Sequence, residues 1–290
     1  MPTIVGFLIV FGSVLAGFMM HGGNPVVLLQ WNEFIIIGGA AFGSMIIANG
    51  VRHSLYIIRS IFALLKGNPF SKERYTQLLV MLFELLTVAR SEGMMKLEEH
   101  IENPEASEII RRYPSFLSND RALSFLTDTT KVILSGTVSL HELDMALDMD
   151  IEQYHQEAMF ASHEVKKAGE AMPGFGIVAA VLGVILTMGK IGGDPSEIGQ
   201  SIAAALVGTF LGVLLAYGVC TPLAAALATI ARSELAYLTC IKTTLLAFLK
   251  GDSPMTCVEY ARRTIEPELR PTFAELELRI REVKTRMANK

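Results

Sequence analysis

The amino-acid sequence predicts an all-α, polytopic membrane protein with four transmembrane helices and a helical cytoplasmic domain. Of the 290 residues, 51% are hydrophobic, and many of them gather in uninterrupted apolar runs of roughly 18 residues or more. A run of this length crosses about 30 Å of hydrocarbon as a helix. A soluble helical protein would instead spread its apolar residues along amphipathic faces, so we expect the chain to cross a membrane.

The first two predicted crossings lie near the N-terminus. Thr3–Met20 is apolar and has neither a basic region before it nor a clear cleavage site, so we interpret it as a membrane helix and not as a signal peptide. The connector that follows contains Trp31, the only tryptophan, at a place suited to an interfacial aromatic anchor. Phe34–Val51 is the second crossing, and Arg52 and His53 are expected to end it.

The third and fourth predicted crossings, Met172–Gly189 and Ile198–Ala226, are joined by a short polar loop. Neither contains Asp, Glu, Lys, Arg or His, and the cores of the first two crossings lack them as well. Ionisable residues inside a membrane usually mark proton relays and ion sites. The chain therefore either moves no ion or forms a wall around a partner that supplies the acid.

The remaining elements are expected to be helices of a polar insert and a C-terminal tail. Helical spacing and chain breakers predict short helices in the insert over residues 73–90, 96–102, 105–112 and 120–134. Ser139 and Glu142 fit a capping box at the start of a long helix that runs into the third crossing. In the tail, helices are predicted over residues 228–249, 254–263 and 272–287.

These elements predict four consecutive parts of the chain. They are transmembrane helices 1 and 2 (1–51), a cytoplasmic helical domain (52–170), transmembrane helices 3 and 4 (171–227) and a cytoplasmic helical tail (228–290). All but one of the 25 Lys and Arg residues lie in the insert or the tail, and the exception is Lys190 in a short connector. The positive-inside rule then places the insert, the tail and both termini in the cytoplasm.

Composition and spacing exclude several other classes of protein. The formal net charge is −4 and no basic patch indicates nucleic-acid binding. The three cysteines show no metal-ligand spacing, and the six histidines are scattered without a nucleophile or base beside them. We therefore expect neither an enzyme nor a bound cofactor.

Two kinds of residue in the third and fourth crossings are candidates for function. Thr209 is a mid-membrane hydroxyl, which either bonds back to the preceding turn or faces a permeating cation. Pro173 and Pro222 are either simple boundary residues or hinges between membrane and cytoplasmic parts. Small residues recur at packing intervals, among them Gly208 and Gly212, which permit close helix contact.

Several long motifs, in order, resemble the MotA family of flagellar stator proteins. They are PGFGIVAAVLGV and VGTFLGVLLAYGVCTPLA in the crossings, MKLEEHIENPEASEI in the insert and ELRPTFAELE in the tail. The resemblance covers essentially the whole chain. It implies a pentameric ring of this chain in the bacterial inner membrane, surrounding two helices of a MotB-like single-span subunit whose intramembrane Asp carries the coupling ion. It also implies that the ring turns the rotor protein FliG.

The resemblance assigns roles to residues of this sequence. It implies that Arg90 and Glu98 engage rotor charges of opposite sign, and that Pro173 and Pro222 contribute to torque. Thr209 matches a channel-facing threonine.

The coupling ion follows from one further position. Ala180 stands where sodium-driven relatives tend to carry Thr, and its methyl group offers no oxygen to a dehydrating Na⁺. The resemblance therefore implies H⁺ as the coupling ion. Glu92, close to Arg90, is a departure that would place an acid beside the basic rotor contact.

Two alternative functions remain open from the sequence. One is an ExbB/TolQ-like energiser of outer-membrane processes, although those proteins resemble a three-helix plan with the N-terminus outside. The other is a passive membrane scaffold, whose stripes of small residues would look the same. A neighbouring reading frame for a single-span subunit with an intramembrane Asp would separate the scaffold from the stator.

Overall fold

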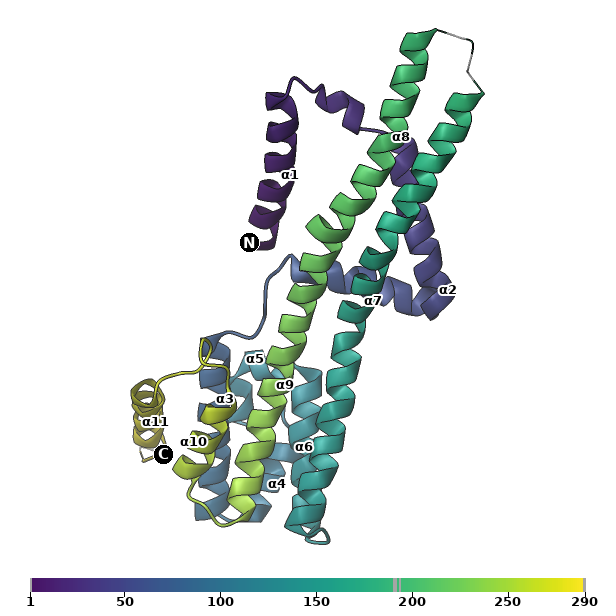
Figure 1. Ribbon diagram of the computed structural model, residues 1–290. Coiled ribbons are helices and arrows are strands. Elements are labelled where there is room, and N and C mark those ends of the chain that lie inside the picture. Colours follow the sequence, from purple (N-terminus) through teal and green to yellow (C-terminus); the bar gives the residue numbers. More distant parts are fainter. Residues whose placement is uncertain (1, 190–191, 193, 289–290) are drawn as a thin grey trace. The chain divides into compact units, whose positions relative to one another are not determined.

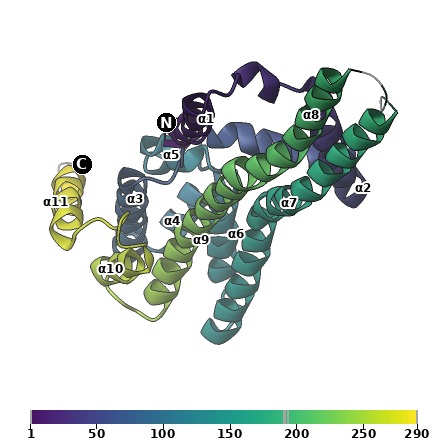
Figure 2. The same ribbon diagram turned by 45° about the horizontal axis from the view of Figure 1, so that its top comes forward.

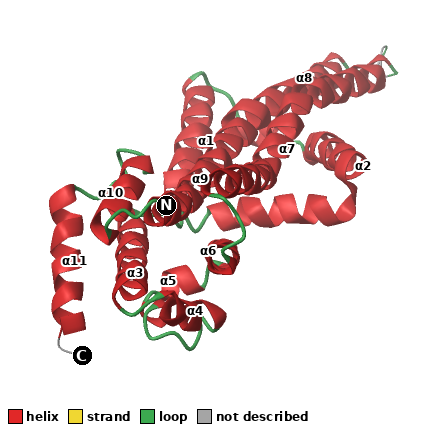
Figure 3. Ribbon diagram, turned by 90° about the horizontal axis from the view of Figure 1, so that it is seen from below, coloured by secondary structure: helices red, strands yellow, loops and turns green. Residues whose placement is uncertain are grey.

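The computed structural model describes residues 2–189, 192 and 194–288, so Lys190 lies outside the described residues. Every regular element in this part of the chain is helical (Figures 1 and 3). Four of the helical segments are long and apolar enough to cross a membrane, with apolar windows within Thr3–Met20, Pro25–Leu64, Leu140–Met188 and Pro195–Leu249. The predicted all-α fold with four long apolar helices is therefore confirmed.

The chain folds as two compact units. The membrane unit comprises residues 1–68 and 158–229, and the globular unit comprises residues 69–157 and 230–290. Two helices, α7 (Leu140–Met188) and α9 (Thr221–Leu249), belong to both units. Each unit is thus built from two separate stretches of sequence.

The membrane unit begins with α1 (Pro2–Met20), η1 (Pro25–Leu28) and α2 (Trp31–Leu64). The C-terminal part of α7 then lies beside α8 (Pro195–Leu215), as both Figure 1 and Figure 2 show. A single π-turn, η3 (Ala216–Cys220), connects α8 to α9. The helix predicted over residues 228–249 is therefore part of α9, which already begins at Thr221 within the predicted fourth crossing.

The second crossing was expected to end at Arg52 and His53, and the structure bends α2 two residues earlier, at Gly50, whose backbone angles are φ 71° and ψ 167°. The helical stretch that follows the bend and continues to Leu64 was not predicted. Glycine adopts a positive φ without the steric penalty that a side chain would cause. Charge near a membrane boundary thus did not stop the helix, whereas a glycine two residues earlier bent it.

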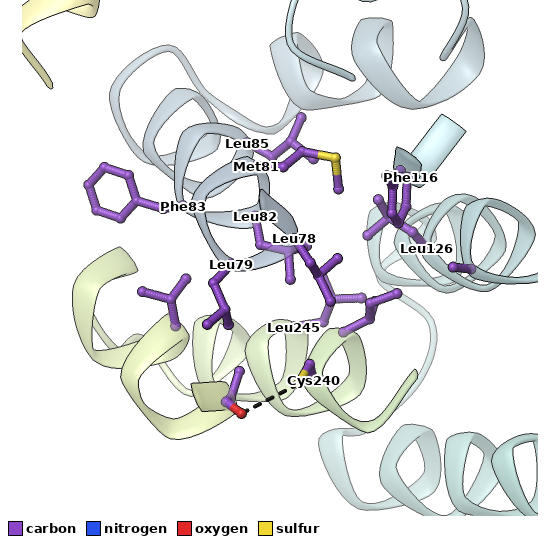
Figure 4. Packing of buried hydrophobic residues seen from close by; sticks show 14 of the residues in the cluster. Leu78, Leu79, Met81, Leu82, Phe83, Leu85, Phe116, Leu126, Cys240 and Leu245 are labelled. Carbon is purple, nitrogen blue, oxygen red and sulfur yellow. Dashed lines mark hydrogen bonds between the residues drawn. The ribbon is translucent and has the colours of Figure 1, made fainter. Parts of the chain in front are cut away.

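The globular unit is built from helices of the insert and the tail around one hydrophobic core. Its elements are α3 (Lys72–Ser91), α4 (Met94–Glu102), η2 (Ile110–Arg112), α5 (Pro114–Leu117), α6 (Asp120–Ser135), α10 (Pro254–Thr264) and α11 (Phe273–Ala288), together with parts of α7 and α9. Figure 4 shows Leu78, Leu82 and Leu85 of α3 pointing into this core. Cys240 of α9 lies in it too, and its thiol donates to the carbonyl oxygen of Ala261.

Local signals in the sequence fix several helix ends. The predicted capping box is present: the Ser139 N–H donates to Glu142 Oε2 at 3.0 Å, and the Glu142 N–H donates to Ser139 Oγ at 3.3 Å. Gly136 ends α6 in the left-handed conformation at φ 65°. The helix predicted over residues 105–112 is wrong, because turns precede a short 3-10 element at Ile110–Arg112.

A buried carboxylate joins three elements of the globular unit. Glu84 of α3 is 1% exposed and is held by Arg112, by the Tyr113 hydroxyl at 2.6 Å and by Arg286 of α11 at 3.5 Å. Charged groups are rarely buried unless they are paired in this way. The network therefore ties α11 to α3 in addition to the apolar contacts of the core.

Candidate functional site

Helices α7 and α8 contact each other through the backbone of glycine residues. A Cβ atom on Gly176 would lie 2.8 Å from the carbonyl oxygen of Gly208, and one on Gly212 would lie 2.7 Å from the carbonyl oxygen of Met172. Real side chains do not reach such distances, so only glycine permits this approach. The spacing of small residues therefore reflects an actual helix interface in the membrane unit.

This interface also carries the predicted hydroxyl. Thr209 is half-buried, and its Cα atom lies 3.4 Å from the position of a Cβ on Gly176. Thr187 and Thr221 donate their hydroxyl groups to the carbonyl oxygens of Gly183 and Ala216, at 2.8 and 2.9 Å. The Thr209 hydroxyl makes no such bond within the described residues, so it keeps a free donor in the middle of α8.

Ala180 lies at the same level of the membrane unit. Its neighbour Ala179 is buried, and its methyl carbon lies 3.1 Å from the position of a Cβ on Gly208, the residue before Thr209. Ala180 itself is half-buried and carries no polar side-chain atom. The structure thus places the two predicted ion-pathway residues on facing helices next to the same contact.

Glu33 is the residue that the sequence interpretation missed. Helix α2 begins at Trp31 and not at Phe34, so Glu33 lies in its first turn, where it is 7% exposed. Its Oε2 atom has no hydrogen-bond partner within the described residues and lies 2.5 Å from the position of a Cβ on Gly208. The structure therefore adds a buried carboxylate in the first turn of α2, before the helix cores that were expected to lack ionisable groups.

A signal for Glu33 was present in the spacing of α2. Glu33 shares one helical face with Ile37 and Ala41, four and eight residues later, and all three side chains are buried. That face belongs to an apolar cluster with Val207 and Leu211 of α8. A predicted second crossing that began one turn earlier would have placed the Glu33 carboxylate on the packed side of α2.

The two predicted hinge prolines have different surroundings. Pro173 lies inside α7, which continues without interruption to Met188. Pro222 follows η3, and the N–H and the hydroxyl of Thr221 both reach the carbonyl oxygen of Ala216. Proline lacks a backbone donor, and the wider π-turn before Pro222 accommodates the hydrogen-bond shift that this causes.

A sulfur contact shows that the prolines lie close to the same level. The Cys220 thiol, two residues before Pro222, lies 3.6 Å from the sulfur of Met172, directly before Pro173. A Cβ on Gly169 would lie 2.6 Å from the Cβ of Cys220. The π-turn before Pro222 therefore faces the part of α7 that contains Pro173.

The predicted rotor contacts belong to the globular unit. Arg90 is exposed in the last turn of α3, and its Nη1 donates to the carbonyl oxygen of Asp252 at 3.1 Å. Glu98 is exposed on α4, beyond the break at Gly93, where φ is 98°. No ion pair between described residues joins Arg90 to Glu98. Glu92 ends α3 and is also exposed.

The charged groups near α4 have perturbed acid–base properties. The Glu99 carboxylate is 2.6 Å from Lys96 Nζ, and this hydrogen bond raises the pKa of Lys96 and lowers the pKa of Glu99. Burial lowers the pKa of His100, whose Nδ1 lies 3.0 Å from the Ser107 hydroxyl oxygen. Within the described residues no group of three or more His, Cys, Asp and Glu side chains could hold a metal ion.

The geometry defines a multi-pass membrane protein in which α7 and α8 pack closely through glycine. These two helices carry no ionisable group between Met172 and Met188 or between Ile198 and Leu215.

Two family models match the chain. Residues 4–93 match the motility protein A N-terminal model, and residues 121–239 match the MotA/TolQ/ExbB proton channel family.

Similar proteins cover nearly the whole chain. It is 38% identical to motility protein A of Salmonella typhimurium over 284 residues, which cover 98% of this chain and 96% of that protein. It is 36% identical to the chemotaxis protein LafT of Vibrio parahaemolyticus, over 96% and 97% of the two chains. The chain therefore belongs to the motility protein A family of flagellar stator proteins, which are channel components and not enzymes.

Solved structures confirm the fold. The chain superimposes on C. jejuni MotAB with a TM-score of 0.75 and 20% identity, over 92% of this chain and 96% of that one. It superimposes on the flagellar MotAB stator complex of Bacillus subtilis with a TM-score of 0.74 and 21% identity, over 95% and 100%. The predicted family is thus confirmed by sequence, and the predicted architecture by structure.

Proposed function

We propose that five copies of this chain form a ring around two transmembrane helices of a MotB-like subunit, and that the ring converts proton-motive force into torque on the rotor protein FliG. The observation that carries the proposal is the wall formed by α7 and α8. It is closely packed through Gly176, Gly208 and Gly212, lacks ionisable groups, and offers a free hydroxyl at Thr209. Such a wall suits a pathway in which a partner supplies the acid.

The ion pathway in this proposal passes Thr209 and Ala180. Thr209 can donate or accept a hydrogen bond to water or to the partner's carboxyl group, because no other described group of the chain occupies its hydroxyl. Ala180 supplies no oxygen atom to replace the water that Na⁺ loses on entry. The coupling ion is therefore H⁺, and each translocated charge provides about 2.3 kcal/mol per 100 mV.

Torque passes from the wall to the globular unit through Pro173 and Pro222. Support comes from the π-turn before Pro222 and from the sulfur contact that places both prolines at one level. Helices bend most readily where a backbone hydrogen bond is missing or shifted. Because α7 and α9 are continuous, a change of bend in the membrane unit reorients the helices that enter the globular unit.

The globular unit lies in the cytoplasm of a bacterial cell, together with both termini, and the four crossings lie in the inner membrane. In this orientation Arg90 and Glu98 contact FliG. Their exposure and their lack of an ion pair with each other leave both charges available to a partner. Glu92 is exposed at the end of the same helix and contributes a second negative charge to this surface.

Charge exchange tests the rotor contact. The variants Arg90→Glu and Glu98→Lys are expected to abolish swimming while the protein remains in the membrane at normal levels. Matched controls are Lys131→Glu and Glu105→Lys, which reverse exposed charges of the same unit and should leave swimming intact. Normal swimming of the Arg90 and Glu98 variants would show that neither residue engages the rotor.

Ion replacement tests the coupling. Swimming speed is expected to collapse with a protonophore and to ignore removal of sodium. A requirement for sodium would contradict the argument from Ala180. Proton flux should also be measured through the complexes of variants that have lost swimming. Flux without swimming indicates a defect in rotor contact, whereas a passive scaffold conducts no ions.

A further inference from the structure

The segment after the bend of α2 has no role in the function proposed above. We call residues 51–66 the interfacial segment. The straight part of α2 before it, Trp31–Asn49, is about 28 Å long at 1.5 Å per residue, close to the thickness of a hydrocarbon core. The bend at Gly50 therefore comes where a helix that starts at one membrane surface reaches the other. Beyond it the helix runs across the direction of the neighbouring part of α7 (Figures 1 and 3).

One face of the interfacial segment is packed and the other is open. Ser54, Ile57 and Leu64 are at most 4% exposed, and the ring of His53 packs edge-on against Phe160 of α7 at 5.7 Å. Large apolar side chains remain exposed on the flanks of the segment: Val51, Leu55, Tyr56, Phe62 and Leu65. Phe62 is 64% exposed and Val51 is 60% exposed. Several large exposed apolar side chains on one short segment indicate a membrane or protein contact.

A row of cations runs between these apolar side chains. Arg52 and Arg59 lie seven residues apart on the side of the helix opposite Ser54 and Ile57, Lys66 follows seven residues later in the turn after the helix, and all three are exposed. No Asp or Glu occurs between Glu33 and Glu73 in the sequence. None of the three cations forms an ion pair with any carboxylate in the described ranges.

Apolar side chains beside a row of unpaired cations match the chemistry of an anionic membrane surface. The apolar groups enter the boundary of the acyl chains, while the long Arg and Lys side chains reach the phosphates. The continuity of the segment with a transmembrane helix brings this face to the membrane boundary. We propose that the interfacial segment binds anionic phospholipids of the adjoining leaflet, through Arg52, Arg59 and Lys66.

Lipid retention by the purified full chain tests this proposal. The chain is equilibrated in mild detergent with equal amounts of phosphatidylglycerol and phosphatidylcholine, and the retained lipids are counted by native mass spectrometry. Each basic residue near an anionic surface strengthens binding by about fivefold. We expect the wild-type chain to prefer phosphatidylglycerol by at least about tenfold, and the Arg52→Gln, Arg59→Gln, Lys66→Gln variant to lose that preference.

The matched control replaces three exposed cations of the globular unit: Arg111→Gln, Lys131→Gln and Lys250→Gln. It should retain phosphatidylglycerol as the wild type does. An unchanged preference in the interfacial variant, or an equal loss in the control, overturns the proposal. A change of oligomeric state without a change of lipid preference also overturns it, because a second copy of the chain would then cover the face.

Two measurements on proteins close to the wild type keep the test independent of folding defects. The preference of the wild-type chain should fall as ionic strength rises toward 1 M, where charges are screened within about 3 Å. Arg59→Gln alone should lower the preference by about fivefold. Glycerol 3-phosphate, which has the phosphate without acyl chains, should not displace the lipid, and equal displacement would identify a phosphate site instead.

Discussion

Replacing Gly176 by alanine tests whether the close contact of α7 and α8 is needed. The new Cβ would lie 2.8 Å from the Gly208 carbonyl oxygen and 3.2 Å from the Cα of Gly212, and both are backbone atoms. No flexible side chain can move aside, so the two helices must separate by a few tenths of an ångström. Gly174, two positions away on the same helix, has no heavy atom within 4 Å of its own Cβ position and provides the control.

The magnitude follows from two opposing effects. Overpacking of a close interface costs about 1–3 kcal/mol. Alanine gains about 0.5–1 kcal/mol over glycine inside a helix, because it loses less backbone entropy. Gly174→Ala should therefore stabilise the chain by about 0.5–1 kcal/mol, and Gly176→Ala should destabilise it by about 0.5–2 kcal/mol. The difference between the variants isolates the steric cost, about 1–3 kcal/mol.

The free energy of unfolding of the purified chain, measured by denaturant titration in detergent, checks this expectation. Swimming speed in cells that carry each variant provides a second measurement. Because Gly176 also approaches the Cα of Thr209, separation of the helices should displace the hydroxyl and slow swimming. If Gly176→Ala proved as stable and as motile as Gly174→Ala, the glycine contacts would not set the geometry of the wall.

Three further predictions concern separate sites. Gly208→Ala should lower thermal stability because its Cβ meets the Glu33 carboxylate, and adding Glu33→Ala should restore part of the loss; strict additivity of the two changes would contradict the contact. Burial lowers the pKa of His100, so its stabilising effect is complete above its ordinary value of 6.5 and is lost as the pH falls through the lowered pKa. The unfolding temperature should then drop more between pH 7 and pH 5 in the wild type than in His100→Gln. Burial raises the pKa of Cys240 to about 12, so a maleimide should label it only after denaturation, and rapid labelling of the folded chain would refute its burial.

Much of the fold follows from the sequence because its strongest signals are local. Runs of apolar residues identified the four long helices, and the pair Ser139 and Glu142 identified the start of α7. The continuation of α2 was missed because Arg52 and His53 were taken as its end. In the structure both residues are helical. Their charged and polar side chains remain exposed, while Ser54 and Ile57 of the same helix pack inward.

The candidate site depends on contacts between distant parts of the chain, which local patterns do not contain. Stripes of small residues predicted that α8 packs closely, but not that Gly208 faces both Gly176 and Glu33. Likewise, the sequence does not tell which membrane threonines bond back to their own helix. In the structure Thr187 and Thr221 do so, whereas the Thr209 hydroxyl makes no such bond within the described residues. Arg90 and Glu98 came from the family resemblance, because exposed charges alone do not distinguish a contact from a solvated surface.

The arrangement of glycine and proline along α7 gives the wall two mechanically different parts. From Gly176 toward Met188 the helix is held against α8 by backbone contacts, and these leave little freedom to bend. At Pro173 a backbone donor is missing, and the facing stretch of the neighbouring helix is the π-turn before Pro222. A disturbance at Thr209 therefore cannot be absorbed between the glycine contacts. In the function proposed above, we expect it to appear as a change of bend at the level of the two prolines, where α7 lacks a backbone donor and the neighbouring helix has a π-turn.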